Sequence, residues 1–539
     1  MEKTFICIDK KMLFKKICKD YINKNKGLYF SYIAISTLSY ITKIIITPMI
    51  YSNILNLKED NTFLIISQIF KLWIFMGIIY IVKIRIENNL FSTFLSFARQ
   101  YLFRLFLEKN QTNFNDSSVT SDINRILEVT RYMKEIFAWI SQYILPISLS
   151  MICINAYFLY KLPIMGVINI FSNVIMISYI NNNYKKLIDE SIKRENSYSH
   201  MVKKLDENFN NLLNIYLNNQ VEKTISENEK IENDYKDIYI KQNETVSDFI
   251  SNIKIINYIF IMICIYILSK KSKDKQNFIN IILIFTFYLS TIEGLIEDIP
   301  FIIMTIGNIN YAEPFLENTL KKEIRESYIP NFEGNIKVDN ISFKYENSPY
   351  LFENFSLDIK KGERIAIIGK TGKGKSTLVK ILLDFYDINK GNIYLDGVNY
   401  KDIPIEEIRK NINYINQKTI LFNDTILNNM KYGNDKTDKD IINFLRKYQL
   451  DNIFYDINKI IEKNGSMISM GMQKVIFLVR GILKNSPVII FDEPFSGIDQ
   501  NTRKLVLHMI DEETKDKTVI IITHDLEGIE DIIDKIIEL

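Results

Sequence analysis

The stretch Gly369-Lys370-Thr371-Gly372-Lys373-Gly374-Lys375-Ser376 decides the fold of the C-terminal part of this chain. It fits the pattern GxxxxGK[ST], in which glycines let backbone N–H groups curl around phosphate oxygens. The apolar run Ile365–Ile368 before it predicts a strand, and Thr377–Leu383 after it predicts a helix whose N-terminus adds a positive dipole. The stretch is therefore predicted to be a phosphate-binding loop, with Lys375 reaching the β- and γ-phosphates and Ser376 holding Mg²⁺.

We expect a bound nucleotide to contact the whole loop and the residue that follows it. These predicted nucleotide-binding residues are Gly369, Lys370, Thr371, Gly372, Lys373, Gly374, Lys375, Ser376 and Thr377. Lys370 and Lys373 are charges beyond those the pattern needs. Two interpretations of them stay open, solvent exposure or a stronger attraction for phosphate.

A second apolar run, Val488–Phe491, ends in Asp492 and Glu493. A buried strand that delivers a carboxylate to Mg²⁺ at its C-terminal end has this pattern. A second carboxylate beside the first can accept a proton from an attacking water. We therefore predict Asp492 as a metal ligand and Glu493 as a catalytic base.

Strand-like and helical patterns alternate along the rest of this region. The strand-like runs are Ile336–Val338, Arg364–Ile368, Asn392–Leu395 and Val488–Phe491. Such alternation predicts an α/β domain of the P-loop NTPase class, beginning at about residue 331.

These motifs, in this order, resemble those of ATP-binding cassette (ABC) proteins over about residues 335–539. The resemblance implies that Tyr345, in an aromatic loop, stacks on adenine. It implies that Gln417, in the Q-loop, senses Mg²⁺ and the membrane domain and takes part in catalysis. It also implies that Asp499 belongs to the D-loop and that His524, in the switch loop, contacts the γ-phosphate. ATP and Mg²⁺ are the cofactors expected.

The signature motif departs from the usual Leu-Ser-Gly-Gly-Gln of the family. Here the matching segment is Ile468–Met472, which keeps Ser469 and Gly471 but has Met470 in place of a Gly and Met472 in place of the Gln. In the family this segment contacts the γ-phosphate of ATP bound to the other cassette. A side chain at Met470 would crowd that close backbone approach. One member of an asymmetric heterodimer and a homodimer with two slower sites both fit this departure.

The first half of the chain holds apolar runs that are near or above the roughly 20 residues a membrane-spanning helix needs. Six spans are predicted: 27–55, 63–84, 137–160, 162–180, 249–268 and 278–306. Short links join the first and second, the third and fourth, and the fifth and sixth spans. The long connections, 87–135 and 181–248, read as charged helices over 123–136 and 201–234.

The placement of lysine and arginine orients the spans. The lysine-rich N-terminus and both long connections favour the cytoplasm, whereas four lysines in the link 270–275 disagree with this topology. The even number of spans and the predicted cytoplasmic cassette are stronger evidence for this topology than the lysines of that link are against it. We expect a multi-pass membrane protein with a cytoplasmic cassette.

Several charged residues lie inside the apolar runs, among them Lys43, Lys71, Glu293 and Glu297. Intramembrane charges usually face a cavity or one another. Glu293 and Glu297 are four residues apart and share a helix face, so an acidic lining for a cationic cargo is one interpretation. The other is that the sixth span extends past the bilayer.

Composition excludes several classes of protein. A net charge of +3, from 67 Lys plus Arg against 64 Asp plus Glu, argues against a strongly basic nucleic-acid binder. A mean hydropathy of −0.01 with 24% charged residues indicates that the chain has one hydrophobic part and one polar part. The four cysteines are scattered, so neither a zinc site nor a disulfide framework is predicted.

The predicted fold class is a multi-domain chain, with an all-α six-helix transmembrane domain and an α/β P-loop NTPase domain, the ABC cassette. The predicted segments are a basic N-terminal cytoplasmic helix (1–26), a transmembrane domain with two long cytoplasmic excursions (27–310), a linker (311–330) and a nucleotide-binding domain with a short C-terminus (331–539). The membrane part resembles the exporter-type (type IV) membrane domain. That resemblance implies short docking helices near 112–122 and 211–219.

The sequence predicts an ABC half-transporter that exports or flips a substrate across a membrane and hydrolyses ATP. Its expected partners are a second half-transporter chain, the lipid bilayer and an unidentified cargo, with no nucleic acid. The alternative is an ATP-binding regulatory or weakly hydrolysing half of an asymmetric heterodimer. There are three further alternatives: a soluble ABC ATPase acting on nucleic acid or ribosomes, an ATP-gated pore and an importer subunit. The six apolar runs count against the soluble ATPase. The fusion of these runs to a cassette counts against the importer subunit.

Overall fold

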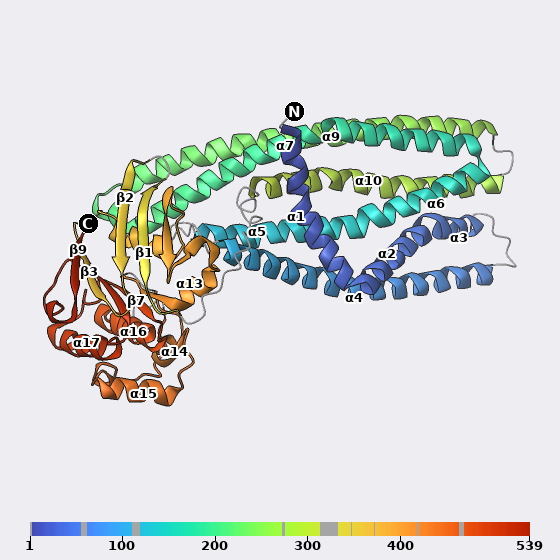
Figure 1. Cartoon of the computed structure of the whole chain (residues 1–539). Helices are drawn as coiled ribbons and strands as arrows, with labels where there is room; N and C mark the ends of the chain where they lie inside the picture. Colours follow the sequence, from blue (N-terminus) through green and yellow to red (C-terminus); the bar gives the residue numbers. More distant parts are fainter. Residues whose placement is uncertain are drawn as a thin grey trace. The chain divides into compact units, whose positions relative to one another are not determined.

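The structure is a computed structural model that describes residues 3–54, 62–109, 119–271, 275–312, 332–345, 348–370, 372–417, 420–462 and 468–539. The chain divides into two compact units. Unit 1 comprises Met1–Glu108 and Asp116–Leu320, and unit 2 comprises Lys109–Asn115 and Lys321–Leu539. Unit 1 is helical and unit 2 is α/β (Figure 1).

Unit 1 consists of long helices. Its described elements are α1 (Lys3–Lys24), α2 (Lys26–Ile41), η1 (Thr42–Ile46), α3 (Thr47–Ile54), α4 (Thr62–Lys109), α5 (Val119–Trp139), η4 (Ile140–Ile144), α6 (Leu145–Lys161), α7 (Pro163–Asn210), α8 (Leu212–Leu217), α9 (Val221–Lys271) and α10 (Lys275–Ala312). The helices α4, α7 and α9 have 48, 48 and 51 residues. At about 1.5 Å per residue, each reaches well beyond the thickness of a bilayer.

Five helical segments of the described residues are long and apolar enough to cross a membrane: Lys26–Ser52, Arg125–Lys161, Pro163–Asn210, Val221–Lys270 and Phe278–Ile309. They overlap the first, third, fourth, fifth and sixth predicted spans. The second predicted span, 63–84, lies within α4 and is not one of these five, so the count of six is not confirmed. Many of its apolar side chains are nevertheless exposed, among them Phe63 at 87% and Trp73 at 63%.

Two prolines explain the irregular turns of the membrane helices. The π-helical segments η1 and η4 end just before Thr47-Pro48 and Leu145-Pro146. Proline lacks the N–H that would bond to the carbonyl four residues earlier, and a wider π turn accommodates the lost bond. The helix before Pro48 therefore contains a local π turn.

The charged helices predicted after the spans are continuous with them for part of their length. Helix α7 runs from the membrane span to Asn210, and α9 runs back alongside it (Figure 1). The predicted uninterrupted helix 201–234 is wrong, because the short helix α8 separates α7 from α9. Asn219 has a φ of +52°, a left-handed conformation that asparagine tolerates and that ends a helix.

The short helix α8 lies where a docking helix was predicted, within 211–219. Its apolar side chains Leu213, Tyr216 and Leu217 are exposed. The other predicted docking helix, near 112–122, lies mostly outside the described residues. The linker predicted over 311–330 also lies outside the described residues, apart from residues 311–312. The same holds for the central part of the lysine-rich link 270–275.

The structure describes the surroundings of three of these charged residues. Lys43 and Lys71 are exposed. Glu297 on α10 accepts a 2.5 Å hydrogen bond from Lys254 on α9, and the two form an ion pair. Such a pair fits either interpretation of Glu297.

Unit 2 contains two sheets. Its strands are β1 (Ile336–Lys344), β2 (Tyr350–Ile359), β3 (Arg364–Ile368), β4 (Lys390–Leu395), β5 (Val398–Asn399), β6 (Ile412–Ile415), β7 (Val488–Asp492), β8 (Thr518–Ile522) and β9 (Lys535–Glu538). One sheet is antiparallel with the order β2-β1-β4-β5, and the other is parallel with the order β6-β7-β8-β3-β9. The four strand-like runs of the sequence lie in β1, β3, β4 and β7, as predicted.

The helices of unit 2 are α12 (Lys375–Leu382), α13 (Ile405–Asn411), α14 (Ile426–Lys431), α15 (Asp438–Lys447), α16 (Met470–Leu483) and α17 (Gln500–Glu513). One apolar core lies between the sheets and α12, and a second joins α14, α15, α16 and α17 to β7 and β8. The central strands β7 and β8 are buried along their whole length, as expected for a parallel sheet covered on both faces.

Candidate nucleotide-binding site

Four neighbouring parallel strands deliver the predicted site residues to one edge of the sheet. The phosphate loop follows β3, Asp492 ends β7, His524 follows β8, and Gln417 follows β6. Ligands of open α/β sheets bind outside the carboxyl ends of the strands. The sheet therefore places four separate sequence segments at one potential ligand site.

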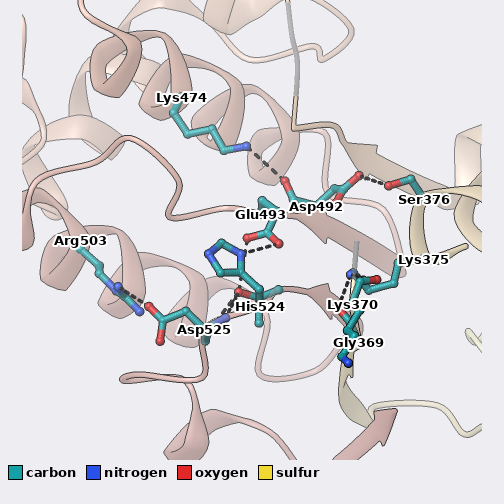
Figure 2. A network of polar contacts seen from close by, with 11 residues as sticks. Gly369, Lys370, Lys375, Ser376, Lys474, Asp492, Glu493, Arg503, His524 and Asp525 are labelled. Atoms are coloured by element: carbon teal, nitrogen blue, oxygen red, sulfur yellow. Dashed lines mark hydrogen bonds and ion pairs between the residues drawn. The ribbon is translucent and has the colours of Figure 1, made fainter. Parts of the chain in front are cut away.

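The phosphate loop passes from β3 into α12 through left-handed glycines. Gly372 has a φ of +88° and Gly374, the N-cap of α12, a φ of +95°. Only glycine adopts such angles without strain, so the spacing of the motif follows from the turn. Lys375 folds back over the loop and donates to the carbonyl oxygens of Gly369 (2.6 Å) and Lys370 (3.3 Å) (Figure 2). Thr371, predicted to bind nucleotide, lies outside the described residues.

The hydroxyl of Ser376 and the carboxylate of Asp492 meet at the base of the loop. Ser376 Oγ donates to Asp492 Oδ2 over 3.2 Å, and the Tyr414 hydroxyl donates to the same oxygen over 2.7 Å. Two hard oxygen donors this close, with room left for phosphate and water oxygens, suit Mg²⁺, which keeps several non-protein ligands. The residues present therefore fit the ion that the sequence predicts.

Glu493 and His524 form a second pair at the same edge. His524 Nδ1 lies 2.9 Å from Glu493 Oε1, and the Thr523 hydroxyl donates to Glu493 Oε2 over 3.5 Å. The Glu493 side chain is 13% exposed and that of His524 is 74% exposed (Figure 2). The carboxylate is thus held inside the site while the imidazole faces outward, where a phosphate could reach it.

The backbone of Glu493 is strained. Its φ of +47° is left-handed, and a non-glycine residue seldom adopts that conformation unless surrounding contacts hold it. The Glu493 amide donates to the carbonyl of Ile522 on β8 over 2.9 Å. This contact fixes the turn that aims the carboxylate.

Lys474 is a site residue that the sequence prediction missed. It lies on α16, is 5% exposed, and its side chain donates to the backbone carbonyl of Asp492 over 3.2 Å (Figure 2). It also donates to the backbone carbonyl of Asn416 over 3.4 Å. Burial lowers the pKa of Lys474 to about 8, against the opposing effect of the Asp492 and Glu493 carboxylates. The signal in the sequence was a lysine directly before the apolar run Val475–Val479 of this helix.

Tyr345, the predicted adenine-stacking residue, lies beside the loop. Its hydroxyl is 2.7 Å from the hydroxyl of Thr377, and its ring packs edge-on against Phe343 and Tyr386. Neighbouring rings and a hydroxyl thus hold a partly exposed aromatic face. Gln417 is exposed and directly follows Asn416, whose carbonyl contacts Lys474.

The signature segment begins α16. Ser469 is the N-cap and accepts a hydrogen bond from the Met472 amide over 3.2 Å. A Cβ on Gly471 would lie 3.1 Å from the carbonyl oxygen of Gly497, so this position closely approaches the D-loop. Met470 is 74% exposed. The segment has an ordered helix start but presents a methionine side chain on its outer surface.

Two further contacts order the loops after β7 and β8. Asp499 caps α17 by accepting from the amides of Asn501 and Thr502, and these hydrogen bonds, that of Thr502 first, lower its pKa. Asp525 pairs with Arg503 at 2.9 Å. The hydrogen bond from the Glu527 amide, and then Arg503, lower the pKa of Asp525.

Comparison with known proteins agrees with this geometry. The family described as ABC transporter matches residues 352–496. The fold resembles the solved structure of a bacterial Atm1-family ABC exporter with ATP bound, with a TM-score of 0.80 over 96% of this chain and 93% of that one, at 18% identity. Residues 352–496 therefore match the ABC transporter family, and the chain has the fold of an ABC exporter. Its fold class is that predicted, apart from the unconfirmed count of six spans.

Sequence relatives of this chain come from several organisms. The ABC transporter ATM1 of Plasmodium falciparum is 44% identical over 208 residues, which are 38% of this chain and 20% of that protein. The mitochondrial iron-sulfur clusters transporter ATM1 of Debaryomyces hansenii is 39% identical over 213 residues, 38% of this chain and 30% of that protein. The ATP-dependent lipid A-core flippase of Francisella tularensis is 34% identical over 228 residues, 41% of this chain and 37% of that protein. Each match thus spans well under half of the relative's own length.

Proposed function

We propose that this protein exports or flips a substrate across a membrane, driven by ATP that binds and is hydrolysed between the cassettes of two chains. The observation that carries the proposal is the set of contacts at one sheet edge, where Ser376 meets Asp492 and His524 meets Glu493. These contacts join a phosphate loop, a metal-binding carboxylate and a candidate base. An ATPase needs these three parts close together.

The phosphate loop would hold the nucleotide. Backbone amides of Gly369–Ser376 and the ammonium of Lys375 would take up the phosphates, so Lys375 would exchange its loop carbonyls for phosphate oxygens. Thr377 would lie at the start of the helix behind them, and Tyr345 would stack on adenine. Ser376, Asp492 and Gln417 would hold Mg²⁺, which, when bound, would offset the charge of the β- and γ-phosphates.

Glu493 and His524 would act on the attacking water. Glu493 would orient the water and take its proton as the water oxygen bonds to the γ-phosphorus and the bond to the bridging oxygen breaks. His524 would contact the γ-phosphate, and its hydrogen bond to Glu493 would hold both groups in place. Since ADP lacks the γ-phosphate contacts, cassette closure would be favoured only before hydrolysis.

The second chain would complete the site. Ser469 and Gly471 of one chain would face the γ-phosphate bound by the other, with Asp499 of the D-loop beside them. The membrane part would contribute six spans per chain, with the domain limits 1–26, 27–310, 311–330 and 331–539, and the cassette would lie in the cytoplasm. The cargo is left open, because the relatives' names describe an iron-sulfur cluster transporter and a lipid A-core flippase.

The test is Glu493→Gln in the purified chain in lipid nanodiscs. The amide keeps the shape and the hydrogen bonding of the side chain but cannot accept the proton. We expect ATP binding to remain and ATP turnover to fall by at least about 100-fold, as for loss of a general base. Turnover equal to that of the wild type would refute the assignment of Glu493 and with it the hydrolytic mechanism.

A second candidate function, as one half of an asymmetric heterodimer, rests on a separate observation. Met470 places an exposed side chain at the surface that would approach the partner's nucleotide. In an asymmetric heterodimer this chain would then bind ATP competently but weaken hydrolysis at the partner's site. ATP turnover by the isolated chain, compared with turnover after co-purification with a partner, separates this function from the homodimer.

A further inference from the structure

Lys474 lies where the predicted catalytic segments of the cassette meet. It projects from α16, whose neighbouring residues Val475, Ile476 and Phe477 are buried in an apolar core. Its ammonium reaches two backbone carbonyls, those of Asp492 and Asn416. A methionine at this position would fill similar space without the cost of burying a charge. The lysine therefore provides something other than packing.

The contact with Asp492 acts on one peptide unit. The carbonyl of Asp492 accepts from Lys474, and the N–H of the same peptide, that of Glu493, donates to Ile522. In a trans peptide these two groups point in opposite directions in one plane. Held at both ends, the plane cannot rotate, so the orientation of the bonds that lead to the Asp492 and Glu493 side chains is fixed.

The strained φ of Glu493 makes this restraint necessary. A left-handed non-glycine residue relaxes to a more favourable conformation unless its surroundings hold it. Rotation of the peptide plane would move the Glu493 carboxylate away from His524. Lys474 and Ile522 together oppose that rotation from two different elements, α16 and β8.

The contact with Asn416 joins a second element to the same ammonium. Asn416 follows β6 and precedes Gln417, a predicted metal-binding residue, and its side chain accepts from Tyr414, which in turn holds Asp492. The ammonium therefore connects the start of the Q-loop with the end of β7.

We propose that Lys474 is a positioning residue, which fixes the Asp492–Glu493 peptide and the start of the Q-loop so that Glu493 faces the attacking water. This proposal rests on the proposed ATPase function. Lys474 itself touches neither the nucleotide nor the water. Its removal is expected to lower the rate of hydrolysis and to leave ATP affinity nearly unchanged.

The principal variant is Lys474→Met, which keeps the length of the side chain and removes its donors. Lys484→Met is the matched control, because Lys484 is a partly buried lysine at the end of the same helix that donates to the Arg409 carbonyl over 2.7 Å. Lys474→Arg tests rescue by a side chain that still carries donors. Lys474→Gln, which retains one amide donor, replaces Lys474→Met if the latter does not fold.

Two measurements decide the proposal. For Lys474→Met we expect kcat for ATP hydrolysis to fall by about 10- to 100-fold with KM within about threefold, as for misplacement of a catalytic group. Lys484→Met should retain wild-type kcat, and Lys474→Arg should recover most of it. In the Glu493→Gln background, Lys474→Met should cause no further loss, because both changes act through the same carboxylate.

Hydrogen exchange of peptides that contain the Glu493 amide provides a readout independent of turnover. Exchange should become at least about tenfold faster in Lys474→Met and stay unchanged in Lys484→Met, since only the first loosens this peptide. Unchanged exchange and unchanged kcat in Lys474→Met would overturn the positioning role. Absence of ATP turnover in the wild type, with exchange altered as expected, would overturn the proposed function and leave the positioning contact supported.

Discussion

The cassette has two functional faces, and they differ in how completely the structure assembles them. On the phosphate-loop face, hydrogen bonds join Ser376 to Asp492 and Glu493 to His524, so residues at the ends of three strands form one site. On the signature face, Ser469 caps its helix and Gly471 approaches the D-loop, but Met470 stands exposed beside them. One face is complete within the chain, whereas the other is altered at the surface that we propose meets a second chain.

This difference indicates where the chain is free to vary. The phosphate-loop face depends on strand order and on left-handed backbone angles, so a change there disturbs the fold of the site itself. The signature face depends on a short helix start whose shape survives a change from glycine to methionine. We therefore expect substitutions on the first face to abolish activity and substitutions of Met470 and Met472 on the second face to change its rate.

The largest effect is expected for Lys375→Ala. Removal of the ammonium leaves the phosphates without their main side-chain cation. ATP affinity, measured by equilibrium binding of labelled ATP, should fall by at least about 100-fold, because a buried charge-assisted contact with phosphate is lost. Lys360→Ala, a change to an exposed lysine outside the phosphate loop, is the control and should retain wild-type affinity.

Tyr345→Ala is expected to have a smaller effect on the same face. Stacking of a base on an aromatic ring is worth about 1–3 kcal/mol, so ATP affinity should fall by about 5- to 100-fold. Tyr345→Phe keeps the ring and loses only the hydroxyl contact with Thr377. If Tyr345→Ala and Tyr345→Phe bind ATP equally well, the ring does not stack on adenine.

On the signature face, restoration of the usual residues should raise activity. Met470→Gly together with Met472→Gln removes the exposed side chain and returns the family pattern. The ATPase rate of the purified chain should rise by about 3- to 10-fold, the gain expected when a crowded transition-state contact is relieved. An unchanged rate would show that Met470 does not limit hydrolysis and would favour the homodimer with ordinary sites.

The smallest effect is expected at the D-loop cap. Asp499→Ala removes the acceptor for two amides of α17 and should lower the midpoint of thermal unfolding by about 2–4 °C, whereas Asp499→Asn keeps an acceptor and should change it less. The pKa of Asp499 is lowered in the fold. Its stabilising contribution is therefore present above the ordinary aspartate pKa and is lost as the pH falls through the lowered value. Thermal unfolding at pH 7 and at pH 3 measures both effects.

The sequence predicted those parts of the site that lie in short local patterns. The phosphate loop, the end of β7 and the residues after β6 and β8 each have a local signal, and the parallel sheet brings them together. Lys474 and Tyr414 were missed because their partners are distant in the chain, and nothing local shows that a lysine in an apolar helix reaches the carbonyls of Asn416 and Asp492.

In the membrane unit, hydropathy located the spans but not the breaks between helices. The π turns before Pro48 and Pro146 and the interruption after Asn210 depend on single residues within otherwise helical patterns. The second predicted span shares α4 with a long polar extension, so hydropathy gives its position without settling its limits. The backbone geometry of single residues therefore sets where these helices are interrupted, which average hydrophobicity does not predict.

The central claim is that each ATP site combines the phosphate-loop face of one chain with the signature face of another. The direct test mixes two variants that should each be inactive, Glu493→Gln and Ser469→Arg, and measures the ATPase rate after the chains have exchanged. Half of the dimers formed from equal amounts would be mixed, each with one intact site, so about a quarter of the wild-type rate should return. If the mixture stays as inactive as the separate variants while mixed dimers form, the sites are not shared between chains and the claim is wrong.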